Sequence, residues 1–399
     1  MALFLQWKTF AAISVFLLLQ IIAFGSQFPE VEWSKTFGGP FFNVLNSVEQ
    51  TSDGGYILAG TTKSQLSERT QGWLIKTGSK GVMEWEKNIF DINGDVQIRS
   101  VRETTDGGYV LAGWLQTKNN RSGKLIKTDS KGVIEWERTY PNYNNTETEL
   151  DSVQQTSDEG YIAAGVTGGY AWLIKTDSKG ITEWERIFGC QDCWPGFALS
   201  EIQQTSDGGY IGVGLGTSKE KQPNGDGWLI KTDPKGVREW EKSFGGSDWY
   251  SLTSVQETAD CGYIASGKAQ NSKEQSGWLI KTDSKGIEEW EKTFENGYDL
   301  RSVKQAADTG YIIAGTFAKT IPNGSSVDFV FEGWLIKTDS KGAVEWEKTF
   351  DGPDFCELNS IQETTDGGYI MAGETKFDEI KSMDGLLIKL KGKSAEKAG

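Results

Sequence analysis

Residues 151–188 read DSVQQTSDEGYIAAGVTGGYAWLIKTDSKGITEWERIF, and this stretch is one copy of a repeat that runs through the 399-residue chain. Its last marker is a Trp in the setting Glu-Trp-Glu-Lys/Arg, which returns about every fifty residues. The copies are Trp85, Trp136, Trp184, Trp240, Trp290 and Trp346, with an outlying copy at Trp33. Self-similarity at this period indicates a repeat architecture.

Two more markers keep the same register and define seven units. A Gly-Tyr pair ends in Tyr56, Tyr109, Tyr161, Tyr210, Tyr263, Tyr311 and Tyr369. A Trp-Leu-Ile-Lys element, or a close variant of it, ends in Lys76, Lys127, Lys175, Lys231, Lys281, Lys337 and Lys389. Residues that recur in every unit build a scaffold, so function is expected where the repeat breaks.

The quoted unit predicts four short β-strands and no helix. Apolar and polar residues alternate in Ser152–Thr156, Tyr161–Gly165, Trp172–Thr176 and Ile181–Arg186. Four strands joined by tight turns form an antiparallel meander, which is the blade of a β-propeller. We therefore predict an all-β fold, a seven-bladed β-propeller of four-stranded antiparallel blades, with the repeated Trp side chains filling the wedges between blades.

The turn between the first two strands has the pattern Ser/Thr-x-Asp-Gly-Gly-Tyr. Its first Gly is replaced by Glu159, Cys261 and Thr309, whereas its second Gly never changes. We predict a positive φ at the second position, represented by Gly55. The Asp of the turn, such as Asp53, is expected to accept bonds from turn amides, which explains seven Asp without a calcium ion. The recurrent Lys is expected to cover a Trp or to pair with a fourth-strand Glu.

The two ends of the repeat region complement each other. The seventh unit finishes at Leu386–Leu390 without a fourth strand, while Val31–Phe37 is a fourth strand with no unit before it. We expect the N-terminal strand to complete the last blade, which removes open sheet edges. The propeller is predicted over residues 27–390, followed by a disordered polar tail at residues 391–399.

Units of the form Trp-x-Lys-Thr-Phe-Gly-Gly … Asp-Gly-Gly-Tyr … Trp-Leu-Ile-Lys-Thr-Asp resemble the seven-bladed propeller repeats of many secreted or surface proteins, especially archaeal and bacterial ones. The resemblance covers residues 31–390 and implies a fold but no catalytic residue. Lys175–Trp184 is more loosely similar to the Trp-docking repeats of quinoproteins, whose quinone pocket this sequence does not show. Thr51–Gly55 resembles the Asp box of sialidases, although Leu58 replaces its final aromatic residue.

The composition narrows the classes of function. The chain has 41 Lys and Arg against 56 Asp and Glu, which argues against nucleic acid as a partner. It has no His, so the commonest general base and all His-based metal sites are excluded. Enzymes that rely on carboxylates alone remain compatible with this composition. We expect no cofactor and a monomeric protein.

Residues 1–26 have the features of a secretory signal peptide, with a Lys, an apolar run over 10–24 and two small residues. The run is short for a membrane span, so cleavage is favoured over a retained anchor and the mature protein is expected to be secreted, without a membrane span. In a secreted protein, three glycosylation acceptor patterns in the sequence become candidate modification sites. They begin at Asn120, Asn144 and Asn323.

Four Cys are present. Cys190 and Cys193 form a Cys-x-x-Cys that opens no predicted helix, so a thioredoxin-like site is not favoured. A zinc site would need a second such pair, which the sequence lacks. We expect a local disulfide between Cys190 and Cys193, and we place Cys261 and Cys356 on opposite faces.

The variable loops, which follow the second and fourth strands, emerge on one face, opposite the uniform turns. The longest, Thr316–Glu332, is expected to form a lid or arm. Trp194 and Trp249 lie outside the repeat positions, in connections after fourth strands. Their neighbours are Asp192, Phe197, Asp248 and Tyr250. Exposed aromatic rings beside carboxylates suit a sugar, and the alternative is that both Trp cap neighbouring blades.

Asp91, Asn93 and Asp95 supply alternating oxygens and form a calcium candidate, although the segment lacks the Gly and Glu of an EF-hand loop. We predict a secreted, non-enzymatic propeller that presents loops to an extracellular glycan, protein or matrix, with a calcium- or mineral-associated matrix component as one form. The alternative is a polysaccharide-active enzyme that uses carboxylates such as Asp192, Asp248 or Glu357.

Overall fold

The computed structural model describes twelve segments of the chain. They are residues 28–39, 42–63, 69–140, 146–189, 196–217, 225–246, 248–270, 275–295, 297–323, 326–351, 355–376 and 382–392, with backbone alone for those of residues 320–328 that are included. These residues form 28 β-strands and no helix. The predicted all-β class is confirmed.

Twenty of the strands form five separate four-stranded antiparallel sheets, each in chain order. Their bounds are β2 (Asn43–Gln50), β3 (Tyr56–Lys63), β4 (Thr70–Thr77) and β5 (Met83–Ile89); β6 (Asp95–Glu103), β7 (Tyr109–Gln116), β8 (Arg121–Thr128) and β9 (Ile134–Tyr140); β10 (Thr148–Gln155), β11 (Tyr161–Thr167), β12 (Tyr170–Thr176) and β13 (Thr182–Phe188); β14 (Ala198–Gln204), β15 (Tyr210–Gly216), β16 (Asp226–Thr232) and β17 (Arg238–Phe244); and β18 (Trp249–Glu257), β19 (Tyr263–Gln270), β20 (Gln275–Thr282) and β21 (Glu288–Phe294).

The remaining eight strands are connected in one sheet, in which one residue pair, Phe331 with Phe355, joins two antiparallel groups. The first group is β22 (Gly297–Gln305), β23 (Tyr311–Asn323), β24 (Ser326–Thr338) and β25 (Val344–Phe350). The second group is β26 (Phe355–Glu363), β27 (Tyr369–Lys376), β28 (Asp384–Leu390) and β1 (Val31–Phe37). Strand β1 pairs antiparallel with β28, so residues from the two ends of the described chain share one sheet.

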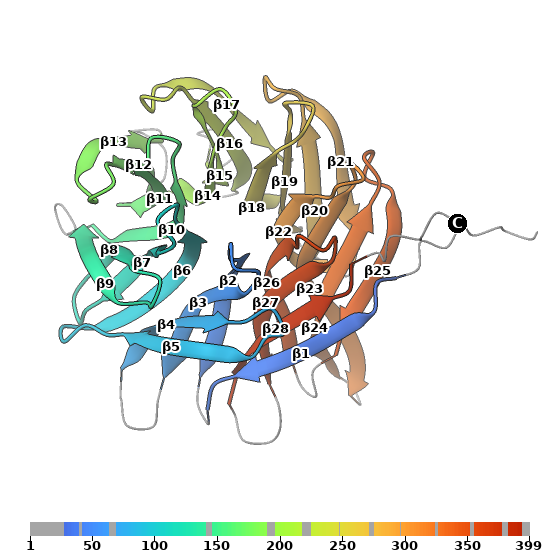
Figure 1. The fold of residues 1–399 in the computed structure, drawn as a ribbon. Coiled ribbons are helices and arrows are strands. Elements are labelled where there is room, and N and C mark those ends of the chain that lie inside the picture. The colour runs from blue at the N-terminus through green and yellow to red at the C-terminus, as the bar shows by residue number, and fades with distance from the viewer. Residues whose placement is uncertain are drawn as a thin grey trace, which may run out of the picture.

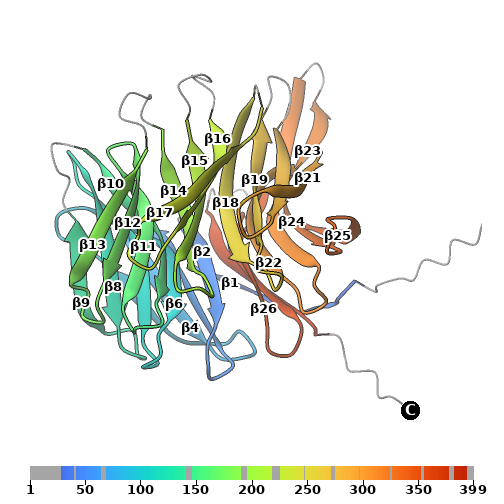
Figure 2. The same cartoon turned by 90° about the horizontal axis from the view of Figure 1, so that it is seen from above.

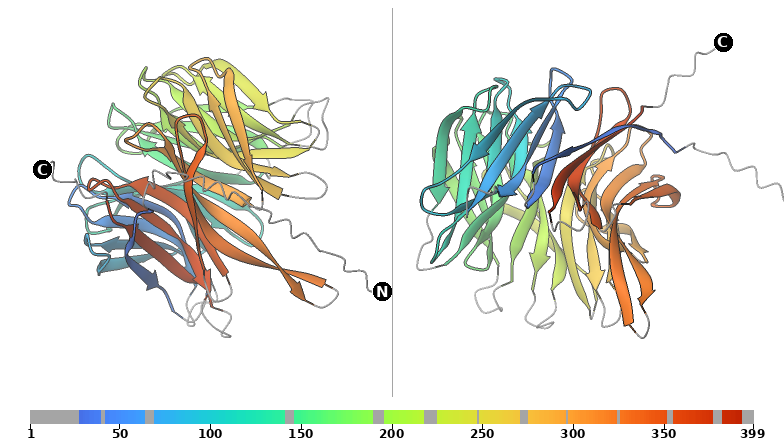
Figure 3. Two further views of the ribbon diagram at one scale, coloured as in Figure 1. Left: turned by 90° about the vertical axis from the view of Figure 1, so that its right-hand side faces the viewer. Right: turned by 90° about the horizontal axis from the view of Figure 1, so that it is seen from below.

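The sheets stand side by side around a common axis (Figure 1, Figure 2). The first strand of each group lies nearest the axis and the fourth lies at the rim (Figure 1). Figure 3 shows the blue strand β1 alongside the red strands near residue 390. Radially arranged four-stranded antiparallel sheets are the architecture of a β-propeller.

The apolar core lies between neighbouring sheets. The second and third strands are buried on both faces, whereas the fourth strands expose their Glu and Lys and half-bury a Trp. That Trp packs on the Gly-Tyr tyrosine of the following sheet, as Trp85 does on Tyr109 at a ring distance of 5.9 Å. Trp33 of β1 contacts Tyr56 of β3 in the same way, so the last sheet packs on the first. The predicted role of the repeated Trp in packing between sheets is confirmed.

The prediction about the two turn glycines is wrong. Positive φ belongs to the first position, where Glu159, Cys261 and Thr309 have φ of 67°, 63° and 68°. The second position is always Gly because there is no room for a side chain. A Cβ on Gly55 would lie 2.2 Å from the Thr77 carbonyl oxygen.

The recurrent Lys is buried on the third strand and neutralised by two carboxylates. Lys175 Nζ lies 2.9 Å from Asp158 of the first turn and 3.2 Å from Glu183 of the fourth strand. The same Asp accepts a bond from the Gly160 amide. Both predicted roles, the turn Asp as acceptor and the Lys as partner of a fourth-strand Glu, are confirmed.

The predicted loop Thr316–Glu332 is mostly regular structure. Strands β23 and β24 have 13 residues each and pair as far as Asn323 with Ser326. This hairpin extends well beyond the body of the molecule (Figure 3). It is an arm and not a lid over the axis.

Candidate functional site

A β-bulge interrupts the first strand of every unit at the same place. In β2 the pairing register shifts between Leu45 and Ser47, which leaves Asn46 without a cross-strand partner. A bulge bends the strand and re-aims the side chain of the extra residue. We call the seven bulged residues the bulge ring: Asn46, Arg99, Asp151, Ser200, Thr253, Arg301 and Asn359.

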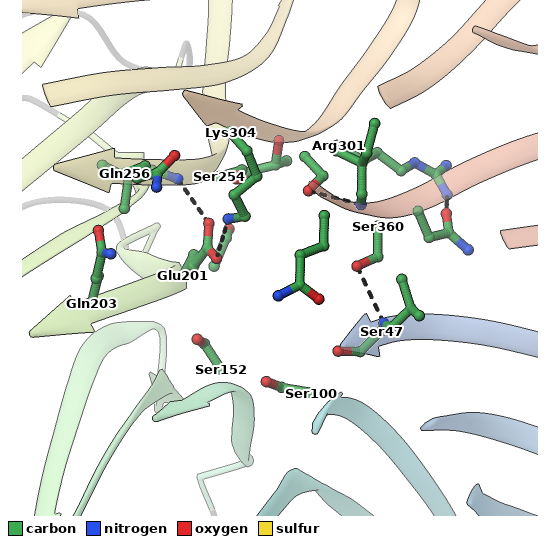
Figure 4. A pocket seen from close by; sticks show the side chains of 18 of the residues that line it. Ser47, Ser100, Ser152, Glu201, Gln203, Ser254, Gln256, Arg301, Lys304 and Ser360 are labelled. Carbon is green, nitrogen blue, oxygen red and sulfur yellow. Dashed lines mark hydrogen bonds and ion pairs between the residues drawn. The ribbon is translucent and has the colours of Figure 1, made fainter. Parts of the chain in front are cut away.

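The bulge ring lines a cavity of about 430 Å³ on the axis of the molecule. The other lining residues also belong to first strands, so the cavity is the central channel (Figure 4). At the bulge position the seven units place five different residue types. The channel therefore contains a level at which the repeat breaks down.

Carboxylates and an amide hold Arg301 in place. Its Nη2 lies 2.6 Å from Glu357 Oε2 and its Nε lies 3.5 Å from Asp299 Oδ2. Its Nη1 donates a hydrogen bond to Asn359 Oδ1, within the bulge ring. Glu374 is the cross-strand partner of Glu357 and adds a third carboxyl group.

This acidic group has a proton affinity unlike that of free carboxylates. Burial raises the pKa of Glu357, and the positive charge of Arg301 opposes the shift. Burial, and then the negative charge of Glu357, raises the pKa of Glu374 to about 7. Glu374 Oε2 is buried and has no hydrogen-bond partner among the described residues. Glu374 can therefore carry a proton near neutral pH.

Arg99 and Asp151 form a second charged pair in the bulge ring, with Nε and Oδ1 4.0 Å apart. Burial raises the pKa of Asp151 to about 7, and Arg99 opposes this shift. The Arg99 guanidinium also lies 4.7 Å from the ring centre of Trp114, which is buried on β7. An aromatic face thus helps to position one cation of the ring.

The residue after the bulge forms what we call the serine belt. It is a Ser in six units and Glu201 in the fourth. Each side chain accepts a hydrogen bond from a backbone amide of the next sheet. The donor and acceptor pairs are Val101 and Ser47, Val153 and Ser100, Ile202 and Ser152, Val255 and Glu201, Val303 and Ser254, Ile361 and Ser302, and Val48 and Ser360. The belt joins each sheet to its neighbour, including the last to the first.

A further level, which we call the glutamine level, repeats this device two residues along each first strand. Five side chains accept a backbone amide of the next sheet at 2.5 to 2.8 Å: Glu49, Gln154, Gln203, Gln256 and Gln362. Arg102 and Lys304 occupy the same position and have no acceptor atom. Both reach Glu201 of the serine belt instead, at 3.8 and 3.6 Å (Figure 4 shows the Lys304 contact).

Four of the six residues of the predicted sugar site can be placed. Trp249 is the first residue of β18 and not part of a loop, and Asp248 precedes it. Phe197 is buried against Trp228, with ring centres 5.3 Å apart, and belongs to the core. Tyr250 packs on Trp278 in the equivalent way, at 5.1 Å. The other two members, Asp192 and Trp194, lie outside the described residues, and so do Cys190 and Cys193 of the predicted disulfide.

The calcium candidate is accounted for by protein contacts. Asp91 Oδ1 accepts two bonds from Asn93, and Asp91 Oδ2 lies 3.3 Å from Nζ of buried Lys124. Asp95 accepts the Thr70 amide. Within the described ranges no group of three or more Cys, Asp or Glu is arranged to hold a metal ion.

The remaining predicted features are the glycosylation patterns, the other two Cys residues and the two termini, and they lie far apart in the chain. Asn120 lies in the turn before β8 and Asn323 ends β23, while Asn144 is outside the described residues. Cys261 is exposed and Cys356 is buried, and both are free. The described part of the chain contains no helix that could cross a membrane. The predicted signal peptide at 1–26 lies outside that part, as do residues 393–399 of the predicted tail.

Sequence reasoning missed the channel. The signal was a recurrent pattern of an apolar residue, a variable residue, Ser and then Val or Ile, as in Leu45-Asn-Ser-Val48. Its variable position is the bulge ring, and its single exception at the Ser position is Glu201. The sequence pattern predicts the first strand only from Ser152, one residue after the bulged Asp151, so it indicates neither the bulge nor the channel.

Comparison with known proteins places the chain by fold alone. No family model and no curated protein sequence matches it. A protein of unknown function from Dyadobacter fermentans aligns with 91% of this chain and 99% of its own at 9% identity and a TM-score of 0.54. The Pan2 WD40 domain of Neurospora crassa aligns with 88% of this chain and 90% of its own at 12% identity and a TM-score of 0.53. These likenesses identify the fold as a β-propeller, the class that includes WD40 domains.

Proposed function

We propose that the chain is a secreted, non-enzymatic propeller of seven four-stranded blades that binds an extracellular glycan at the mouth of its central channel. Separating the eight-stranded sheet at its single bridge divides the 28 strands into seven groups of four, with β1 as the last fourth strand. The apolar run at 10–24 supports secretion.

The bulge ring is the observation that carries this proposal. The units agree where side chains support the scaffold, but they differ where a bulge turns side chains toward a shared cavity. Amides, hydroxyls, guanidinium groups and carboxylates meet there, and these are the partners that sugar hydroxyl groups take. A ring of different polar groups can fix the orientation of an asymmetric ligand.

Trp249 supplies an aromatic face on the same side of the molecule, because it begins the strand that carries the Thr253 bulge. Lys268 Nζ lies 5.2 Å from the Trp249 ring centre. Burial raises the pKa of Glu357, and the charges of Arg301 and Lys268 both oppose that shift. Charged groups thus connect Trp249 with the bulge ring, and a flat ring beside polar groups suits the C–H face of a sugar.

A glycan array with the full chain tests the proposal. We expect binding that falls about tenfold or more in Trp249→Ala, in Trp194→Ala/Trp249→Ala and in Arg301→Ser, which introduces the residue of the fourth unit. Asn359→Ser is a milder ring variant, and Arg238→Ser on outer strand β17 is the matched control. Melting curves show which variants remain folded. Absence of binding, or binding that none of the folded site variants reduces, would overturn the proposal.

The acidic group beside Arg301 favours one alternative, a polysaccharide-active enzyme. A carboxyl with a pKa of about 7, Glu374, beside a second carboxyl, Glu357, has the composition of an acid and base pair. Incubation with neutral and acidic polysaccharides tests this function. Release of reducing ends that is lost in both Glu357→Gln and Glu374→Gln would establish it, and intact polysaccharide with the wild-type chain would exclude it for those substrates.

A further inference from the structure

Three residues that break the repeat meet inside the channel. Arg102, Glu201 and Lys304 come from the second, fourth and sixth units, where the majority residues are Gln, Ser and Gln. Arg102 Nη2 and Lys304 Nζ lie 3.8 and 3.6 Å from the same oxygen, Glu201 Oε1. If each substitution only served the packing of its own unit, the two cations would have no reason to meet at one oxygen atom of the third substituted residue.

These departures do not improve the scaffold. Gln at the glutamine level accepts an amide of the next sheet, as Gln203 does from Glu257 at 2.8 Å. Arg and Lys have no acceptor, so the second and sixth units forgo that bond. Arg102 donates instead to the Val101 carbonyl and to Ser47 of the serine belt. Arg102 still contacts the neighbouring sheet through Ser47, but neither cation makes the amide bond by which the Gln side chains of this level join sheets.

The channel wall around them is rich in hydrogen-bond donors. Each belt Ser accepts a backbone amide with its Oγ and has its own hydroxyl hydrogen to donate, which Ser254 directs to Glu201. Each Gln of the glutamine level uses its carbonyl oxygen in the same way, which leaves its NH₂ group as the part that can bind channel contents. Because backbone amides occupy the acceptors, the wall suits a ligand rich in acceptors.

Both cations keep capacity for a ligand. Their distances to Glu201 exceed a direct hydrogen bond, which is about 2.7 to 3.2 Å. The Arg102 and Lys304 side chains are 28% and 24% exposed, into the channel that they line. Glu49, the acid of the glutamine level, accepts the Glu103 amide. Burial raises the pKa of Glu49, and the charges of Arg102 and Lys304 oppose that shift, so it is a second counter-charge for the two cations. A guanidinium group and an ammonium group facing one space are typical of sites for carboxylate, sulfate or phosphate.

We propose that Arg102 and Lys304 bind an oxyanion group in the channel, with Glu201 as the counter-charge that holds both cations when the site is empty. The group is either a free inorganic oxyanion or the acidic group of a sugar. This inference rests on the proposed function, since it specifies the charge of the ligand that enters the channel.

The test compares sodium glucuronate, sulfate and phosphate with neutral glucose, titrated into the full chain by calorimetry at constant ionic strength. Arg102→Gln/Lys304→Gln introduces the majority residue at both positions but leaves the Glu201 carboxylate without its two cations, so thermal melting checks that the variant remains folded. We expect anion affinity to fall about tenfold or more in this variant. Arg238→Gln/Lys242→Gln removes two cations from outer strand β17 and should bind as the wild type does. Glu201→Ser removes the counter-charge and should tighten anion binding.

Preference for sulfate or phosphate would assign a free oxyanion, and preference for glucuronate would assign an acidic sugar. The inference is wrong if no anion binds, or if the double Gln variant binds anions as well as the wild type does. The proposed function is scored separately. Neutral glycans that respond to Trp249→Ala but not to the double Gln variant would retain glycan binding at the mouth and reject the anion site.

Discussion

The turn face and the channel wall are built from the same seven units, yet the units agree at the turns and differ in the channel. At the turns the invariant groups contact the backbone of their own unit, as Lys76 Nζ does with the Thr77 carbonyl at 3.0 Å. In the channel the bulged residue faces a cavity shared by all units. A position is constrained when its neighbour is backbone and free to change when its neighbour is a cavity.

Removal of the seam between the first and last sheets should have the largest effect. Deletion of residues 31–37 removes the β1–β28 ladder and the contact of Trp33 with Tyr56. We expect loss of the folded monomer, because the exposed edge of β28 would be free to pair with other chains. Size-exclusion chromatography and thermal melting measure this outcome. A monomer with an unchanged melting curve would contradict the seam's role.

Substitutions at two adjacent turn residues distinguish a steric limit on side-chain size from a requirement for positive φ. A Cβ at Gly160 would lie 2.2 Å from the Thr176 carbonyl oxygen, so Gly160→Ala should destabilise the fold by about 3 kcal/mol or more. Its neighbour Glu159 has φ of 67°, and Glu159→Gly should be neutral or stabilise by up to about 1 kcal/mol. Urea unfolding measures both. Equal losses in the two variants would refute the spatial explanation of the fixed glycine.

The acidic group beside Arg301 should respond to pH in the opposite direction from the turns. The pKa of Glu374 is raised to about 7, so the folded state binds more protons than the unfolded state, and stability is lost as pH rises from about 4.5 to 7. Glu374→Gln should therefore stabilise the protein at pH 8 by about 1 to 3 kcal/mol and have little effect near pH 4. Melting temperatures across this range check the sign. A loss of stability at pH 8 would show that the ionised carboxylate supports the fold.

We expect the smallest effect on stability at the turns, where the dependence of stability on pH has the opposite sign. Asp207 has a pKa lowered to about 2: burial opposes the shift, but bonds from Thr205, Lys231 and the Gly209 amide outweigh it. The folded state here binds fewer protons, so this stabilisation is present above about pH 4 and is lost as pH falls toward 2. Because the carboxyl is largely exposed, Asp207→Asn should change stability at pH 7 by less than about 1 kcal/mol. Its acid transition should also be shallower than that of the wild type.

The features of the fold that could be predicted from the sequence are mostly those that depend on residues within a single repeat unit. Strand order, the turn Asp, the packing Trp and the Lys partner all follow from short patterns, and β1 pairs with β28 as the unmatched strands required. The sign of φ at Gly55 was misassigned, because invariance of a glycine reflects either conformation or space. The carbonyl oxygen that excludes a Cβ there comes from the neighbouring third strand and is brought close only by folding.

The channel site could not be predicted, because it depends on how units are placed around the axis. Arg102, Glu201 and Lys304 are distant in sequence and meet only once the ring is closed. Phe197 and Tyr250 looked available for a ligand, but each packs against a repeated Trp. Burial of an aromatic residue near a strand end depends on the neighbouring sheet, which a local pattern does not specify.

The pairing of β1 with β28 also determines how the molecule would respond to mechanical force. Val31 faces Leu390 at one end of the ladder and Phe37 faces Gly385 at the other. The chain therefore enters β1 and leaves β28 at the same end of the ladder. Tension applied through residues 31 and 390 would break the interstrand bonds one at a time, as a zipper opens, instead of shearing them together. Pulled in this way, the ring is expected to open first at its seam.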